Sequence, residues 1–323
     1  GLGLFNYESG NTCFPPSGES TNFNPPAGSF PSTQFVDGGW NALARILPFM
    51  EGNTSFNALN FNVDYNEATG MNFTGAATVV AVYLCPSSAT RQPSGGNDGI
   101  DPNDPITGPP PGFGRGYGYD DYGPTCYTDI DPFGLMNNSA DGKIYPATPY
   151  RNKGARADGL LKQGKTTIAQ VTDGTSNTIA IGEDAGRDPR YLSPYTEGYY
   201  DGVNLRVIGT NSAPGLGPAG GLAPARRYWR WAEPDTSFGV SGQPNNKYQP
   251  SYEVLPWQAP PGPLFTAGNN AGANDELYSF HPGGVNCLFG DGSVHFIRDT
   301  INIVTLRSLV TSHGGEVISA DAY

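Results

Sequence analysis

The chain of 323 residues is poor in charged side chains, which make up 15% of it, and basic side chains are the scarcest: 18 Lys and Arg against 30 Asp and Glu. The net charge of −12 and the lack of any Lys/Arg cluster exclude nucleic acid as a partner, because such binding needs basic side chains that displace counterions. No apolar run approaches the ~18 residues that indicate a membrane-spanning helix. The three histidines and four cysteines form no C-x-x-C pair and no zinc-finger spacing, which argues against a structural zinc site of that kind.

The four cysteines, Cys13, Cys85, Cys126 and Cys287, are widely spaced. Their even number permits two disulfides in any of three pairings, and the sequence does not choose among them. Few Lys residues, abundant Asn, Gly and Tyr, and an acidic balance are typical of exported proteins. We therefore expect an extracellular or cell-surface location.

Gly and Pro are abundant, with 45 and 30 residues, and 12% of the chain is aromatic. This composition predicts a turn-rich, largely β chain that still has enough aromatic side chains to bury a core. Two long stretches, about 88–135 and 185–280, are predicted to be elaborations of the domain. The first is predicted to be largely a loop without regular structure, whereas the second has little periodicity but is expected to contain several aromatic strands such as 227–231. Apolar residues at intervals of three and four predict a helix over 40–50, which Pro48 would end early, and a second helix over about 73–80.

Apolar runs bounded by turn residues predict the strands. A short strand over 82–85 is closed by Pro86, and an Asp-Gly turn joins runs 166–171 and 177–181 into a hairpin. A second hairpin joins 285–289 to 293–297. A closing helix follows, with Asp299 or Thr300 as its N-cap and a Gly-type end near 313–315.

The most specific motif places nine residues between His281 and the pair Asp291-Gly292. It resembles the His-x9-Asp-Gly element near the C-terminus of a large family of bacterial prepilin-type secreted proteins, which are type IV pilin- or pseudopilin-like and have no assigned chemistry. Further stretches resemble that family in its order: 3–7 with 14–16, 47–51, 83–87, 173–178 leading to Gly182-Glu183, 306–309, and 314–317. Together they are scattered over nearly the whole chain.

The resemblance implies an α+β fold: a single pilin-like antiparallel β-sheet domain over 1–323, with short helices and long Gly/Pro/Tyr-rich insertions. Residues 281–323 would be the motif hairpin plus the closing helix. It also implies an upstream hydrophobic helix, absent from this sequence, of which 1–7 would be the C-terminal end. Any contact with a membrane would be made through that helix.

A histidine with carboxylates could bind a metal or run acid–base chemistry, so His281, Asp291 and Glu183 are a candidate site. The interpretation we prefer is a structural one, in which Asp291 stabilises a turn and His281 hydrogen-bonds within its own subunit and binds no metal. The structural motif residues of this interpretation are His281, Gly283, Gly284, Asn286, Asp291, Gly292, Asp173, Gly174 and Glu183. No catalytic residue is assigned.

The acidic stretch Asp98, Asp101, Asn103 and Asp104 is the best sequence candidate for a cation. Hard oxygen ligands packed into seven residues suit Ca²⁺, although the spacing is not that of an EF-hand. A solvated acidic loop is the alternative. Asp120 and Asp121 could contribute to the same site or to a second one. No other cofactor is implied.

The run Phe113–Tyr119 is rich in Tyr and Gly with a single Arg, which suits subunit contacts better than nucleic-acid binding. An ordinary solvated loop is the alternative. From these observations we expect a non-enzymatic structural subunit that associates with copies of itself into an extracellular filament, tube or surface layer. The alternatives are a secreted carbohydrate- or surface-binding pseudopilin-like module and a metal-dependent enzyme using Glu183, His281 and Asp291.

Overall fold

A computed structural model describes residues 1–22, 33–36, 40–66, 69–88, 96–97, 106, 110–128, 157–162, 164–185, 229–240, 243–246 and 277–319. In these parts a mostly antiparallel β-sheet is combined with a few short helices, consistent with the predicted α+β class. The strands are β1 (Glu19–Asn22), β2 (Thr33–Val36), β3 (Tyr122–Thr128), β4 (Ala157–Asp158), β5 (Ile179–Glu183), β6 (Phe238–Val240), β7 (Gly284–Phe289) and β8 (Val294–Arg298). The pair β1–β2 forms a small antiparallel sheet of its own.

The main sheet has six strands in the order β4-β3-β5-β7-β8, with β6 paired to β3. All its pairings are antiparallel except that of β3 with β6, which is parallel. Among the described strands, only β3 pairs with three others, and it lies inside the segment 88–135 that was predicted to be a loop elaboration. Strand β6 likewise lies inside 185–280. The prediction of a loop is therefore wrong at β3. Strands were expected within 185–280, but the described part of the expected strand 227–231 contains only an isolated bridge between Arg230 and Tyr119.

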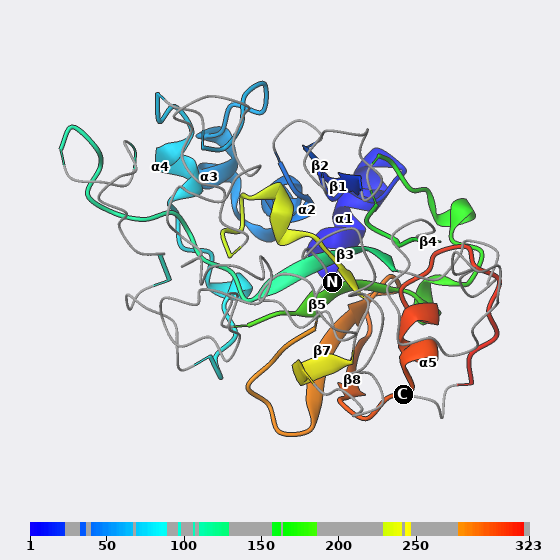
Figure 1. Ribbon diagram of the computed structural model, residues 1–323. Helices are drawn as coiled ribbons and strands as arrows, with labels where there is room; N and C mark the ends of the chain where they lie inside the picture. Colours follow the sequence, from blue (N-terminus) through cyan, green and yellow to red (C-terminus); the bar gives the residue numbers. More distant parts are fainter. Residues whose placement is uncertain are drawn as a thin grey trace.

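The α-helices are α1 (Leu2–Asn11), α2 (Ala42–Ile46), α3 (Asn53–Asn57), α4 (Phe73–Ala76) and α5 (Ile303–Ser308). Single 3₁₀ turns are η1 (Leu47–Met50), η2 (Ala81–Tyr83), η3 (Ile168–Gln170), η4 (Thr175–Asn177), η7 (Pro234–Thr236) and η8 (Pro244–Asn246). The first four helices gather on the β3 side of the molecule, whereas α5 lies beside β7 and β8 near the C-terminus (Figure 1). Among the described residues, no helix is long and apolar enough to cross a membrane.

Two clusters of buried apolar side chains join the main sheet to these helices. Alternate residues of β7, Val285, Cys287 and Phe289, pack in one cluster with Leu306 of α5 and with Leu309, which follows the helix. The other cluster combines residues of α1, α2 and α4 with the buried Trp40 and Trp231, and Leu288 of β7 packs against it. The period-two alternation along β7 thus places its side chains on opposite faces of the sheet.

The hairpin predicted over 285–297 is confirmed as β7 and β8, in a register that pairs Gly284 with Arg298 and Leu288 with Val294. The helix predicted over 40–50 is also confirmed, as α2 followed by η1. Asn41 caps α2, since its side chain accepts a hydrogen bond from the backbone N–H of Ala44. Pro48 lies in the first turn of η1, where the missing N–H is tolerated.

Several local predictions are wrong. Residues 82–85 form no strand, because 82 and 83 belong to η2 and 84 and 85 follow it. Residues 166–171 contain η3 rather than the first strand of a hairpin. A capping box stabilises the N-terminal end of η3, because the side chains of Thr167 and Gln170 each bond to the backbone of the other residue. These hydrogen bonds favour a helical turn over the strand that the apolar alternation predicted. The N-cap of α5 is Asn302, and the helix ends at Ser308, before the predicted glycines.

Candidate functional site

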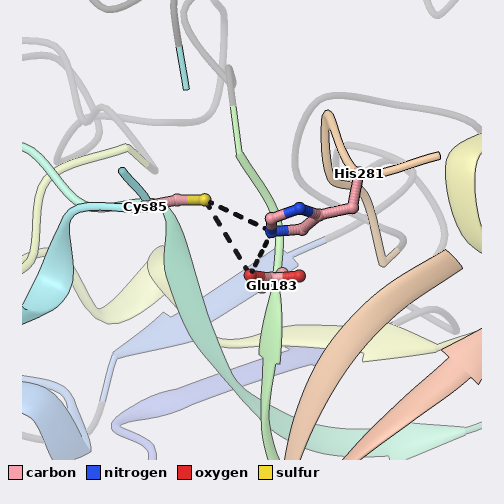
Figure 2. Close-up of side chains that lie close together, drawn as sticks. All are labelled: Cys85, Glu183 and His281. Atoms are coloured by element: carbon pink, nitrogen blue, oxygen red, sulfur yellow. Dashed lines mark hydrogen bonds and ion pairs between the residues drawn. The ribbon is translucent and has the colours of Figure 1, made fainter. Parts of the chain in front are cut away.

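Three side chains from distant parts of the chain converge at one point, Cys85, Glu183 and His281. The Oε1 atom of Glu183 lies 3.3 Å from Nε2 of His281 and 3.9 Å from Sγ of Cys85. The Cys85 Sγ lies 3.8 Å from the same Nε2 atom. Figure 2 shows the three polar ends pointing toward one another, so the thiol, the carboxylate and the imidazole share one small space.

Backbone contacts outside the cluster fix each of the three residues. The Cys85 N–H donates to Oδ2 of Asp121, at 2.8 Å, just before β3 begins. Glu183 is the last residue of β5. The His281 N–H donates to the Ser279 hydroxyl, at 3.0 Å, in the turn that precedes β7. The site is therefore assembled by sheet pairing and turns, not by one local segment.

The carboxylate of Glu183 is 2% exposed and is held by Asn286 of β7. The Asn286 backbone N–H donates to Oε2 at 2.6 Å, and its Nδ2 lies 3.2 Å from Oε2 and 3.3 Å from Oε1. These bonds stabilise the buried carboxylate, which would otherwise lose its hydration without compensation. They also direct Oε1 toward Cys85 and His281.

The electrostatic surroundings of the cluster favour a neutral thiol. Burial raises the pKa of Cys85, the Ser87 backbone N–H works against this, and the Glu183 and Asp121 carboxylates raise the pKa further. Burial likewise raises the pKa of the Tyr122 hydroxyl, which also hydrogen-bonds to Cys85. Because its pKa is raised, Cys85 is a thiol and not a thiolate at neutral pH.

The predicted combination of His281 with Asp291 is not assembled. The two residues lie beyond opposite ends of β7, a strand of six residues that spans roughly 20 Å. Asp291 instead serves its own turn, accepting hydrogen bonds from the Ser293 N–H at 2.9 Å and the Ser293 hydroxyl at 2.6 Å. The structure thus retains Glu183 and His281 from the sequence candidate, and it replaces Asp291 with Cys85.

The glycines of the motif lie at positions where a positive φ or a close backbone contact disfavours any other residue. Gly283 and Gly292, at the two ends of β7, have φ values of +84° and +86°, which glycine adopts without strain. A Cβ atom on Gly284 would clash with the carbonyl oxygen of Ile297 in β8. These positions explain the Gly283-Gly284 pair by backbone geometry.

Asp173 fastens the C-terminal segment to the turn before η4. Its two carboxylate oxygens accept from the backbone N–H groups of Gly314 and Gly315, at 2.7 and 2.8 Å. Gly174 follows with a φ of +91°. Both residues are structural in this arrangement and lie in a different part of the fold from the Cys85 cluster.

The calcium candidate, formed by Asp98, Asp101, Asn103 and Asp104, lies outside the described residues. Asp120 and Asp121 are described and are buried. In the run Phe113–Tyr119, Tyr117 and Tyr119 are buried within the subunit, so the prediction that these tyrosines contact other subunits is wrong. Only Phe113, Gly114 and Arg115 of that run are exposed.

The sequence offered no signal for Cys85 as a site residue. It lies 98 residues before Glu183 and 196 before His281, so no local spacing relates them. All four cysteines are buried and none is in a disulfide, so the pairings left open by the sequence are not formed. Cys85, Glu183 and His281 nevertheless each come from one of the stretches on which the prepilin-type resemblance rests.

A family model described as "Protein of unknown function (DUF1559)" matches residues 1–303 of the chain. No curated protein and no solved structure matches it.

Proposed function

The chain belongs to the DUF1559 family, and on that premise we propose that it is a non-enzymatic structural subunit of an extracellular pilin-like filament, tube or surface layer. The family is commonly associated with type IV pilin-like secreted proteins. The low charge content and the acidic balance are typical of exported proteins. In this function the subunit acts by associating with copies of itself.

The observation that carries the proposal is that strand β8 lies at the end of the main sheet and exposes two apolar side chains. It is the last strand in the order of the main sheet, and of the described strands only β7 pairs with it. Its Val294 and Phe296 are 63% and 45% exposed and lie two residues apart, on one face. Soluble proteins usually protect an edge strand with charges, prolines or bulges, and β8 carries only Arg298 as a permanent charge.

An edge of this kind fits a second copy of the chain. Antiparallel pairing of β8 with a neighbouring subunit would add a strand at this edge and cover the two apolar side chains. Such pairing extends the sheet across subunits.

The test compares assembly of the full chain with that of edge variants. We expect the wild-type protein to form regular assemblies visible by negative-stain electron microscopy, and the V294K/F296K double variant to stay monomeric with an unchanged melting temperature. Ile168→Lys is the matched control, because Ile168 is 47% exposed but lies in η3, away from the edge. A wild-type chain that stays monomeric at all concentrations would contradict the structural-subunit function. Assembly by the double variant would contradict only the role of β8.

A further inference from the structure

We propose that Cys85, Glu183 and His281 form a binding site for a borderline-soft divalent transition metal of the Zn²⁺ class, with three protein ligands and one position left for water. The inference is independent of the proposed assembly, because it rests on a cluster in the interior of one subunit.

The three donor atoms are spaced as metal ligands are. A triangle with sides of 3.3, 3.8 and 3.9 Å has one in-plane point equidistant from its corners, and that point lies about 2.1 Å from each atom. Zinc binds imidazole nitrogen and carboxylate oxygen at about 2.0–2.2 Å and thiolate sulfur at about 2.3 Å. An ion therefore fits among the three side chains with shifts of a few tenths of an ångström.

The donor set selects the class of metal. Thiolate is a poor ligand for Ca²⁺ and Mg²⁺, which prefer shells made of oxygen atoms. Zn²⁺ accepts sulfur, imidazole nitrogen and carboxylate oxygen in the same site. The mixture of Cys85, His281 and Glu183 therefore favours Zn²⁺ and its close neighbours over the calcium that the acidic loop suggested.

A nucleophilic Cys–His–carboxylate arrangement fits the geometry less well. In such triads the carboxylate hydrogen-bonds one ring nitrogen of the histidine and the nucleophile faces the other. Here Glu183 and Cys85 both face Nε2 of His281. Three donors converging on one point are what an ion requires, whereas a proton relay needs them in a row.

The contacts behind the ligands also suit a metal site. Asn286 orients the Glu183 carboxylate through its backbone and side chain, in the way that outer hydrogen bonds commonly fix metal ligands. Cys85 and Glu183 are buried, while the His281 side chain is 28% exposed. An ion would enter from the His281 side, and a water molecule would complete a four-coordinate shell there.

The experiment uses the full chain, freed of metal by a chelator and titrated with Zn²⁺ and then with Co²⁺. We expect one ion per chain by native mass spectrometry, and with Co²⁺ a thiolate-to-metal charge-transfer absorption in the near ultraviolet. Cys85→Ser should abolish that absorption, and His281→Ala should weaken Zn²⁺ binding by at least about 100-fold. Ca²⁺ and Mg²⁺ in excess should displace neither ion.

Matched controls separate the site from general effects of substitution. Cys126→Ser replaces another buried cysteine and retains a donor for the carbonyl oxygen of Phe238, and His295→Ala replaces a histidine on β8. Both should bind as the wild type does. If the Cys85 or His281 variant fails to fold, Asn286→Ala leaves all three ligands in place and should weaken binding by about 10- to 100-fold. Absence of stoichiometric Zn²⁺ binding by the wild type, or a Co²⁺ spectrum without a thiolate band, would overturn the proposal.

Discussion

Each end of strand β7 is followed or preceded by a polar residue of the motif, His281 before the strand and Asp291 after it. The two side chains make different kinds of contact. Before its first residue, His281 meets the buried Glu183 and Cys85, which come from other parts of the chain. After its last residue, the carboxylate of Asp291 accepts hydrogen bonds from Ser293 within its own turn, while the Asp291 backbone N–H donates to the carbonyl oxygen of Thr175. Both ends contain a glycine with positive φ, and both belong to the His-x9-Asp-Gly motif. Tertiary contacts determine the chemistry of the first end, and local hydrogen bonds determine that of the second.

The difference shows that sequence proximity within a motif does not imply a shared site. A carboxylate in an exposed turn is stabilised by water and nearby amides, so its loss is easily tolerated. A carboxylate that is 2% exposed must find all its partners within the protein, so its loss leaves those partners unpaired. This contrast can be measured directly by substitution.

The largest effect is expected at Glu183. In metal-free protein, Glu183→Ala should lower the free energy of unfolding by about 3 kcal/mol, because the Asn286 N–H and His281 lose their buried acceptor. Glu183→Gln keeps an acceptor oxygen and should lose only about 1 kcal/mol. Urea denaturation followed by circular dichroism measures both. Equal losses in the two variants would mean that packing, and not hydrogen bonding, determines the stability of this end.

An intermediate effect is expected at the glycine pair that opens β7. Gly284→Ala should cost about 2 kcal/mol, because its Cβ would clash with the Ile297 carbonyl oxygen. Gly283→Ala meets no atom within 4 Å and should cost only about 1 kcal/mol, the strain of a positive φ. Thermal unfolding of the two variants tests the order. The reverse order would show that β8 moves aside at little cost.

The smallest effect is expected at the other end of the strand, for Asp291→Ala. Although its slight burial acts in the opposite direction, hydrogen bonds from Ser293 lower the pKa of the Asp291 carboxyl. A depressed folded-state pKa contributes stability above the ordinary aspartate value of 3.8, and that stability is lost as the pH falls through the folded value.

We therefore expect Asp291→Ala to lose about 0.5 kcal/mol near neutral pH, because the hydrogen bonds are exposed. The difference from wild type should disappear in strong acid. Denaturation of both proteins across this pH range is the measurement. A difference that grows in acid would contradict the assignment of Asp291 to a purely local role.

The local sequence pattern predicted those elements whose hydrogen bonds and apolar contacts are made between residues only a few positions apart. The hairpin of β7 and β8 follows from alternation around an Asp-Gly turn, and α2 follows from apolar spacing with Asn41 as its cap. The prediction failed for elements whose conformation depends on contacts with residues far away in the sequence. Strand β3 contains a glycine and a proline and has no apolar alternation, and it is a strand because β4, β5 and β6 pair with it.

The sequence by itself determined the α+β class, the closing hairpin, the glycines at its turns and the family of the chain. Only the tertiary structure decided that Cys85 joins Glu183 and His281 and that Asp291 does not. The reason is physical. A turn or a cap is completed by neighbours along the chain, whereas the cluster exists only after β5 and β7 have paired and Asp121 has fixed the backbone of Cys85.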